Sequence, residues 1–139
     1  LVSLILDTNV TVALLNDGDP NHERCRALVE SIREPLVIPA ATLGEVDYWV
    51  QRFMGVRVWR AFAQDVESGA YLLEPTTEQD LSRASELQEQ YEDLRLGYVD
   101  SAVIALCERM REPKVATIDR RHFSVVVPRH VPALELLPH

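Results

Sequence analysis

Short apolar runs alternate with longer amphipathic segments along this chain of 139 residues, and this alternation limits the fold more than any other feature. Parallel strands require long crossover connections, most often helices, and those helices cover both faces of the sheet. Strands are predicted at residues 3–7, 36–39, 71–74 and 115–118, with a possible fifth at 133–137. Helices are predicted at residues 9–16, 21–33, 41–54, 56–68, 77–91 and 98–112, and residues 120–130 are expected to be irregular. The pattern indicates an α/β fold with a central, mostly parallel sheet of four or five strands, flanked by helices on both faces. Residues 1–139 are expected to form a single domain.

Composition excludes several classes of protein. No apolar run approaches the ~20 residues that a membrane span needs, and the first residues lack the basic flank of a signal peptide. Cys25 and Cys107 fall on apolar helical faces, so we expect reduced core residues in a cytoplasmic protein. The net charge of −8 argues against non-specific binding of duplex nucleic acid. It does not exclude a nuclease, because bound cations cancel the charge of clustered carboxylates.

Four acidic residues stand where a predicted strand ends or a predicted helix begins, and they are Asp7, Glu45, Asp100 and Asp119. In a parallel α/β sheet these positions gather in the crevice outside the carboxyl ends of the strands. Carboxylates that converge there repel one another unless a divalent cation neutralises them. The four residues are therefore candidate ligands of Mg²⁺ or Mn²⁺.

Each acid also has a structural interpretation. Asp7 is a candidate helix cap, although Thr8 or Asn9 can take that role and leave Asp7 free to bind metal. Glu45 matches a capping box that begins at Thr42. Asp100 suits the first turn of any helix, and Asp119 suits a turn after a strand. The coincidence of all four at one edge of the sheet favours the metal-site hypothesis.

Neighbouring residues extend the hypothesis. Asp93 is either a solvated turn residue or an outer member of the acidic cluster. Arg120 and Arg121 form, with His122, the most basic cluster of the chain, and arginines beside a metal site suit phosphodiester chemistry. An ordinary solvated loop is the alternative.

Other chemistries lack their motifs. The histidines have no zinc-ligand spacing, and the chain contains no CxxC, Walker A, GxGxxG or GxSxG pattern. An aromatic stripe of Trp49, Phe53, Trp59 and Phe62 is interpreted as core, with a base-stacking platform or a protein interface as the alternatives.

Four segments of the chain together resemble the PIN domain, particularly the toxin ribonucleases of bacterial VapBC toxin–antitoxin modules. The segments are Leu6-Asp7-Thr8-Asn9, residues 39–46 around Glu45, residues 96–102 around Asp100, and residues 116–123 around Asp119. Each segment alone is weak, but their order and spacing cover essentially the whole chain. The acidic set is complete, so nothing indicates an inactive member.

The resemblance implies an endoribonuclease that is the toxin of a type II module. Asp7, Glu45, Asp100 and Asp119 would take the family's acidic positions, with Thr8 or Asn9 in support. It also implies homodimers, inhibition by a VapB-like antitoxin, and a structured RNA substrate, with transfer RNA first and ribosomal RNA second. A water activated by Mg²⁺ or Mn²⁺ would then be the nucleophile.

Two competing hypotheses remain. One is a PIN-like module that binds RNA or protein without turnover. The other is an α/β phosphoacceptor or phosphatase domain that uses Asp7. A phosphatase of this kind needs an aspartate where Asn9 stands, and a receiver domain needs a lysine near the last strands, whereas Lys114 precedes its strand.

Overall fold

Five parallel strands form the centre of the molecule. The structure, a computed structural model, describes residues 2–139. The strands are β1 (Leu4–Ile5), β2 (Leu36–Pro39), β3 (Leu72–Glu74), β4 (Lys114–Ala116) and β5 (Glu135–Leu137). β1, β2 and β3 pair in that order, β4 pairs with β5, and a parallel bridge between Leu6 and Ala116 joins the two sets. The resulting order is β3-β2-β1-β4-β5, which confirms the predicted parallel α/β sheet.

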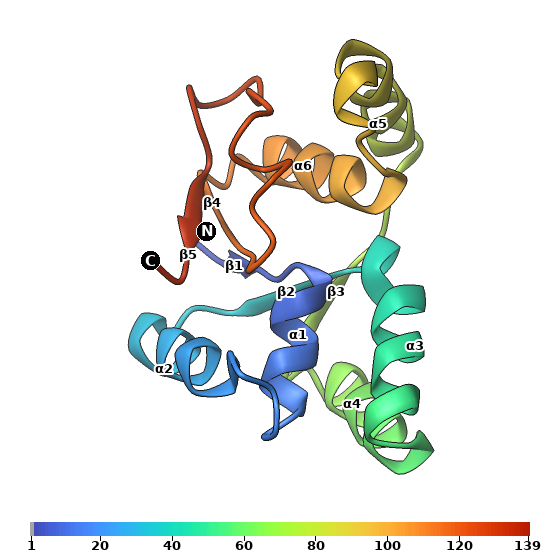
Figure 1. Cartoon of the computed structure of the whole chain (residues 1–139), viewed down its shortest axis with the longest axis vertical. Helices are drawn as coiled ribbons and strands as arrows, with labels where there is room; N and C mark the ends of the chain where they lie inside the picture. Colours follow the sequence, from blue (N-terminus) through green and yellow to red (C-terminus); the bar gives the residue numbers. More distant parts are fainter. Residues whose placement is uncertain (1) are drawn as a thin grey trace.

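Helices cover both faces of this sheet (Figure 1). One face carries α1 (Thr8–Leu15), α2 (His22–Ile32), α3 (Leu43–Phe53) and α4 (Val56–Ser68). The opposite face carries α5 (Glu78–Gln90) and α6 (Tyr98–Met110), which pack against each other. Two short 3₁₀ turns, Ala40–Thr42 and Glu92–Leu94, precede α3 and α6. Within residues 2–139, no helix combines the length and the apolarity that crossing a membrane requires.

The alternation of side chains along the strands divides the core into two parts. Leu4 and Leu6 point into the cluster under α1 to α4, whereas Ile5 points into the cluster under α5 and α6. Val115 and Ala116 divide in the same way. Successive residues of a strand face opposite sides of the sheet, so a buried central strand must be apolar at every position.

The predicted elements agree with the observed ones to within a few residues. The predicted strand 115–118 ends early, at Ala116, because the Ile118 N–H donates to the Asn9 side chain instead of continuing the ladder. The possible fifth strand forms as β5, and residues 120–130 contain no strand or helix. Cys25 and Cys107 are buried and free, as predicted.

The strand order determines where a ligand binds. From β1 the chain steps outward to β2 and β3 on one side, and later to β4 and β5 on the other. The direction of winding therefore reverses between β1 and β4. Open α/β sheets bind ligands at such a switch point, outside the carboxyl ends of the strands. Asp7 follows β1 and Asp119 follows β4 at this place.

Candidate active site

Asp7 is the buried centre of the candidate site, with 4% of its surface exposed. It is the N-cap of α1, and its Oδ1 accepts the Thr8 N–H at 2.9 Å. Its Oδ2 accepts the Thr117 hydroxyl at 2.8 Å. The hypothesis that Thr8 or Asn9 caps this helix is therefore wrong, because a carboxylate buried at this depth must itself accept hydrogen bonds.

Thr8 and Asn9 instead connect α1 to other elements. The Thr8 hydroxyl donates to Glu45 Oε1 at 2.8 Å, and the Asn9 Oδ1 accepts the Ile118 N–H at 3.0 Å. These bonds join α1 to α3 and to the end of β4. Thr8 and Asn9 thus fix the mutual positions of the elements that carry the acids.

Glu45 is free of the capping box that its spacing predicts. The Thr42 hydroxyl donates to the Pro39 carbonyl at 2.8 Å and makes no cap bond. Glu45 is exposed in the first turn of α3, where its carboxylate accepts only the Thr8 hydroxyl among the described contacts. The capping-box interpretation is wrong, because the 3₁₀ turn before α3 leaves Thr42 in a helical conformation that does not suit an N-cap.

Asp100 and Asp119 each contact a cationic or titratable side chain. Asp100 is half-buried in the first turn of α6, and its Oδ2 lies 2.7 Å from His122 Nδ1. Asp119 is exposed and forms a two-point contact with Arg121, with distances of 3.1 Å and 3.0 Å. Both contacts come from the irregular segment that follows β4.

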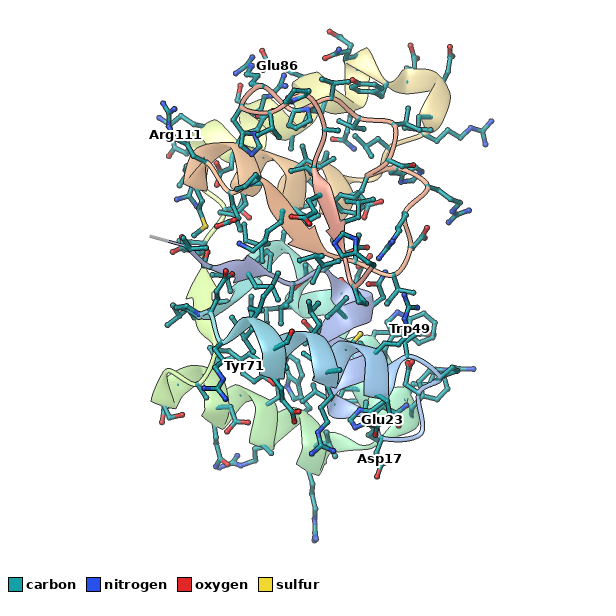
Figure 2. The ribbon with its side chains drawn as sticks, turned by 90° about the vertical axis from the view of Figure 1, so that its left-hand side faces the viewer. Asp17, Glu23, Trp49, Tyr71, Glu86 and Arg111 are labelled. Carbon is teal, nitrogen blue, oxygen red and sulfur yellow. The ribbon has the colours of Figure 1, made fainter. Side chains whose placement is uncertain are left out.

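The four carboxylates converge on one pocket of about 440 Å³. The pocket is lined by Asp7, Thr8, Asn9, Val12, Asp19, Glu45, Trp49, Phe53, Asp100 and Asp119. Figure 2 places Trp49 at the right-hand rim of the molecule, between the helices below the sheet and the C-terminal segment above it. Residues that are more than 110 positions apart in the sequence therefore share one crevice at the switch point.

The charges in the pocket are poorly compensated at its buried end. Burial, and then the charge of Asp100, raise the pKa of Asp7 to about 7. The bonds from Thr117 and Thr8 oppose this rise without cancelling it. At the exposed rim, the hydrogen bond from Arg121 lowers the pKa of Asp119. Among the described residues, Asp7 has no cationic partner, so a bound cation would stabilise its charged form.

The donor set fits a hydrated hard cation. Within residues 2–139, no three acidic, histidine or cysteine side chains approach closely enough to enclose an ion by themselves. Mg²⁺ prefers oxygen ligands and keeps several waters, so it is held by one or two carboxylates with other acids beyond those waters. A buried aspartate surrounded by more exposed acids suits this form of binding.

The predicted supporting residues lie at different distances from the pocket. Asp93 is exposed on the turn before α6 and lines a separate depression with Glu92 and Leu94, so this geometry gives it no part in the site. Arg120 donates to the carbonyls of Thr117 and Pro138, which holds the C-terminal segment against β4. The Arg121 side chain is 81% exposed beside the pocket.

The sequence analysis misses two residues of the site, and it names a third, His122, without predicting its contact with Asp100. Asp19 lines the pocket from the loop after α1, where its sequence indicates only turn chemistry. Thr117 lies inside the predicted strand 115–118, between two apolar residues, and nothing in the local sequence marks it. His122 contacts Asp100 across 22 positions of the chain, and no local spacing predicts such a pair.

The Thr117 hydroxyl is expected to support both the site and the fold. Thr117→Val removes the donor to Asp7 and leaves a buried acceptor with one partner fewer. We expect the free energy of unfolding to fall by about 1–3 kcal/mol in urea titrations. Thr11→Val is the matched control, because the Thr11 hydroxyl is buried without a hydrogen-bond partner. Equal losses in the two variants would contradict the assigned role of Thr117.

Known proteins share this architecture. The PIN domain model matches residues 4–127. Ribonuclease VapC26 of Mycobacterium tuberculosis is 30% identical over 125 residues, which cover 90% of this chain and 93% of the relative. Among solved structures, VapC20 of Mycobacterium tuberculosis, described as a sarcin-ricin loop cleaving toxin, has a TM-score of 0.78 at 23% identity, covering 85% of this chain and 91% of that one. VapBC2 of Rickettsia felis, solved with a promoter DNA fragment, has a TM-score of 0.67 at 16% identity and covers 97% of each chain.

Proposed function

Because this chain belongs to the PIN domain family, we propose that it is a metal-dependent endoribonuclease and the toxin of a VapBC-type toxin–antitoxin pair. One observation carries the proposal. Asp7, Glu45, Asp100 and Asp119 line a single pocket at the switch point of the sheet, and the buried Asp7 has no cationic partner among the described residues. A binding module without turnover has no need for such uncompensated charge.

The metal would be Mg²⁺ or Mn²⁺, held chiefly by Asp7 and Asp100, with Glu45 and Asp119 directly bound or hydrogen-bonded to coordinated waters. When bound, such an ion lowers the pKa of water toward neutrality and stabilises negative charge on the phosphate and on the leaving oxygen. The hydroxyls of Thr8 and Thr117 hold Glu45 and Asp7 in place for this task. Arg121 is the exposed guanidinium beside the pocket and is positioned to contact a substrate phosphate.

The phosphoacceptor alternative has less support. Lys114, which is the only lysine of the chain, pairs with Glu34 and Glu112 and does not line the pocket. The lysine that a receiver domain would need is thus absent from the described lining of the pocket.

The substrate would be structured RNA with an exposed loop, because RNA bases are accessible in single-stranded regions. Transfer RNA is the first candidate and ribosomal RNA the second. A relative described as cleaving the sarcin-ricin loop supports loops as targets.

Similar proteins also support a proposal for the partners of this protein, which are an antitoxin and a second copy of the chain. The solved relatives include toxin–antitoxin complexes, such as one from Klebsiella pneumoniae with a TM-score of 0.69 at 17% identity, covering 89% of this chain and 92% of that one. The acidic pocket and the net charge of −8 suit a basic segment of a VapB-like antitoxin. We expect the protein to form homodimers and to co-purify with a small basic protein when both are expressed from the native operon.

The test of the activity is cleavage of total bacterial RNA by the purified protein. We expect no cleavage in EDTA, and discrete fragments after Mg²⁺ or Mn²⁺ is restored. Sequencing of the new RNA ends identifies the target and the position of the cut. Cleavage that persists unchanged in EDTA would contradict a metal-dependent mechanism, and no cleavage of any RNA with either metal would contradict the ribonuclease assignment.

A further inference from the structure

The pocket has an aromatic side as well as an acidic one. Trp49 and Phe53 line it together with the four carboxylates of the proposed metal site and with Asp19. We propose that the Trp49–Phe53 pair is a stacking platform for a nucleobase of the RNA, next to the phosphate that is cleaved. This inference rests on the proposed ribonuclease function and names the part of the site that binds a base.

The spacing along α3 aligns the platform with the acidic cluster. Glu45, Trp49 and Phe53 follow one another at intervals of four residues, so they lie on one face of the helix. Each interval corresponds to about 6 Å along the helix axis. A nucleotide whose phosphate lies near Glu45 therefore has an aromatic ring about one helical turn away.

The rings are held in place and remain accessible. Trp49 and Phe53 are 40% and 61% exposed, with ring centroids 5.7 Å apart and planes only 6° from parallel. Tyr48 packs edge-on against Trp49, which limits its movement. A base added to such a pair extends an existing stack and orders few new side chains.

The aromatic stripe predicted as core is thus divided by the fold. Phe62 is buried, and Trp59 packs partly buried beside it, so these two rings confirm the core interpretation. Trp49 and Phe53 contradict it, because α3 turns its other face, with Val46 and Val50, toward the sheet. Exposed aromatic rings lose the stabilisation that burial would give them, and a ligand that covers them recovers it.

The composition of the pocket favours a nucleobase over an apolar protein segment. Its described lining contains five carboxylates and two aromatic rings, with Val12 as the aliphatic side chain. An apolar segment in this pocket would remove carboxylates from water without pairing them. A nucleotide instead brings a flat π-surface for the rings and a phosphate for the metal-bound acids.

The net negative charge of the protein increases the share of RNA binding that stacking must supply. At −8 the protein as a whole repels the RNA backbone, so contacts that carry no charge contribute more of the binding. Stacking on aromatic side chains contributes about 1–3 kcal/mol per base and tolerates different sequences. Arg52, whose guanidinium lies 5.9 Å from the centre of the Phe53 ring, places a cation beside the platform.

The experiment combines protein variants with altered RNA. Steady-state cleavage is measured for the wild type, Trp49→Leu and Phe53→Leu, on a short RNA that contains the mapped cleavage site and on the same RNA with single abasic positions. We expect each variant to raise KM by about 5- to 150-fold on intact RNA, with little change in kcat. On the RNA that lacks the stacked base, wild type and variants should differ little.

Two controls separate stacking from other effects. Leu81→Ala removes an exposed apolar side chain of α5 that does not line the pocket, and it should leave KM unchanged. Trp49→Phe and Phe53→Tyr keep an aromatic ring and should retain most of the affinity. Equal losses on intact and on every abasic RNA would overturn the proposal. So would an unchanged KM together with weaker binding of the basic antitoxin, because that result would assign the rings to a protein partner.

A second measurement is independent of catalysis. Trp59→Phe leaves Trp49 as the single tryptophan, since the chain contains two. RNA oligonucleotides are expected to quench its fluorescence, and an oligonucleotide that is abasic throughout is not. Quenching without cleavage would refute the ribonuclease while keeping the platform, whereas cleavage without quenching or a KM effect would refute the platform alone.

Discussion

Asp100→Asn is expected to lower the rate of RNA cleavage by at least about a thousandfold. A bound metal supplies several kcal/mol of transition-state stabilisation, and each ~1.4 kcal/mol corresponds to a tenfold change in rate. The substitution removes one of the two acids proposed to hold the metal, yet the amide oxygen can still accept a bond from His122. The fold should therefore persist while metal affinity falls.

Asp93→Asn provides the matched control for this measurement. Asp93 lies seven residues earlier, is exposed, and does not line the acidic pocket. Initial rates are compared for both variants and the wild type over a range of Mn²⁺ concentrations, with the folding of each variant checked by circular dichroism. If Asp100→Asn cleaves as fast as Asp93→Asn at every metal concentration, the site proposed here is not the catalytic site.

The metal-free protein is expected to become less stable as the pH rises, by about 3 kcal/mol between about pH 5 and pH 8. Burial and the charge of Asp100 raise the pKa of Asp7 from 3.8 to about 7 in the folded protein. The folded protein therefore keeps on Asp7 a proton that the unfolded chain releases near pH 3.8. Binding this proton stabilises the folded state at low pH. It is lost as the pH rises through the folded pKa, when Asp7 must ionise in a buried place.

Urea unfolding in EDTA at several pH values measures this dependence. Asp7→Asn cannot ionise, so the difference in stability between the wild type and this variant isolates the contribution of Asp7 from that of other groups. Mn²⁺ should replace the proton, and at a hundred times its dissociation constant it adds about 2.7 kcal/mol of stability. If the stability of the wild type depends on pH in the same way as that of Asp7→Asn, in EDTA and in Mn²⁺ alike, burial does not raise the pKa of Asp7.

Local patterns in the sequence are sufficient to predict the fold and the acids that converge at one edge of the sheet. The apolar runs around Ile5, Val37 and Val115 predict buried parallel strands because both faces of each strand are covered. The placement of Asp7 and Asp119 directly after two of these strands predicts their convergence, since parallel strands end at one edge. Both inferences depend only on periodicity and on the order of elements along the chain.

The hydrogen bonds of the site need the three-dimensional structure. Glu45 satisfies the spacing of a capping box, yet it accepts a bond from Thr8 because a 3₁₀ turn changes the entry into α3. Burial likewise separates the aromatic stripe, since the rotation of α3 about its axis decides which rings meet the core and which face the pocket.

By itself, the sequence determined the parallel α/β architecture, the four acidic positions and the family to which they belong, because each follows from residues close together in the chain or from their order. Only the tertiary structure decided how strongly the acids interact, that Thr117 and His122 support Asp7 and Asp100, and that Trp49 and Phe53 remain exposed. These properties depend on distances between residues that are remote in sequence and on the loss of water around them. Neither is set until the helices pack on the sheet.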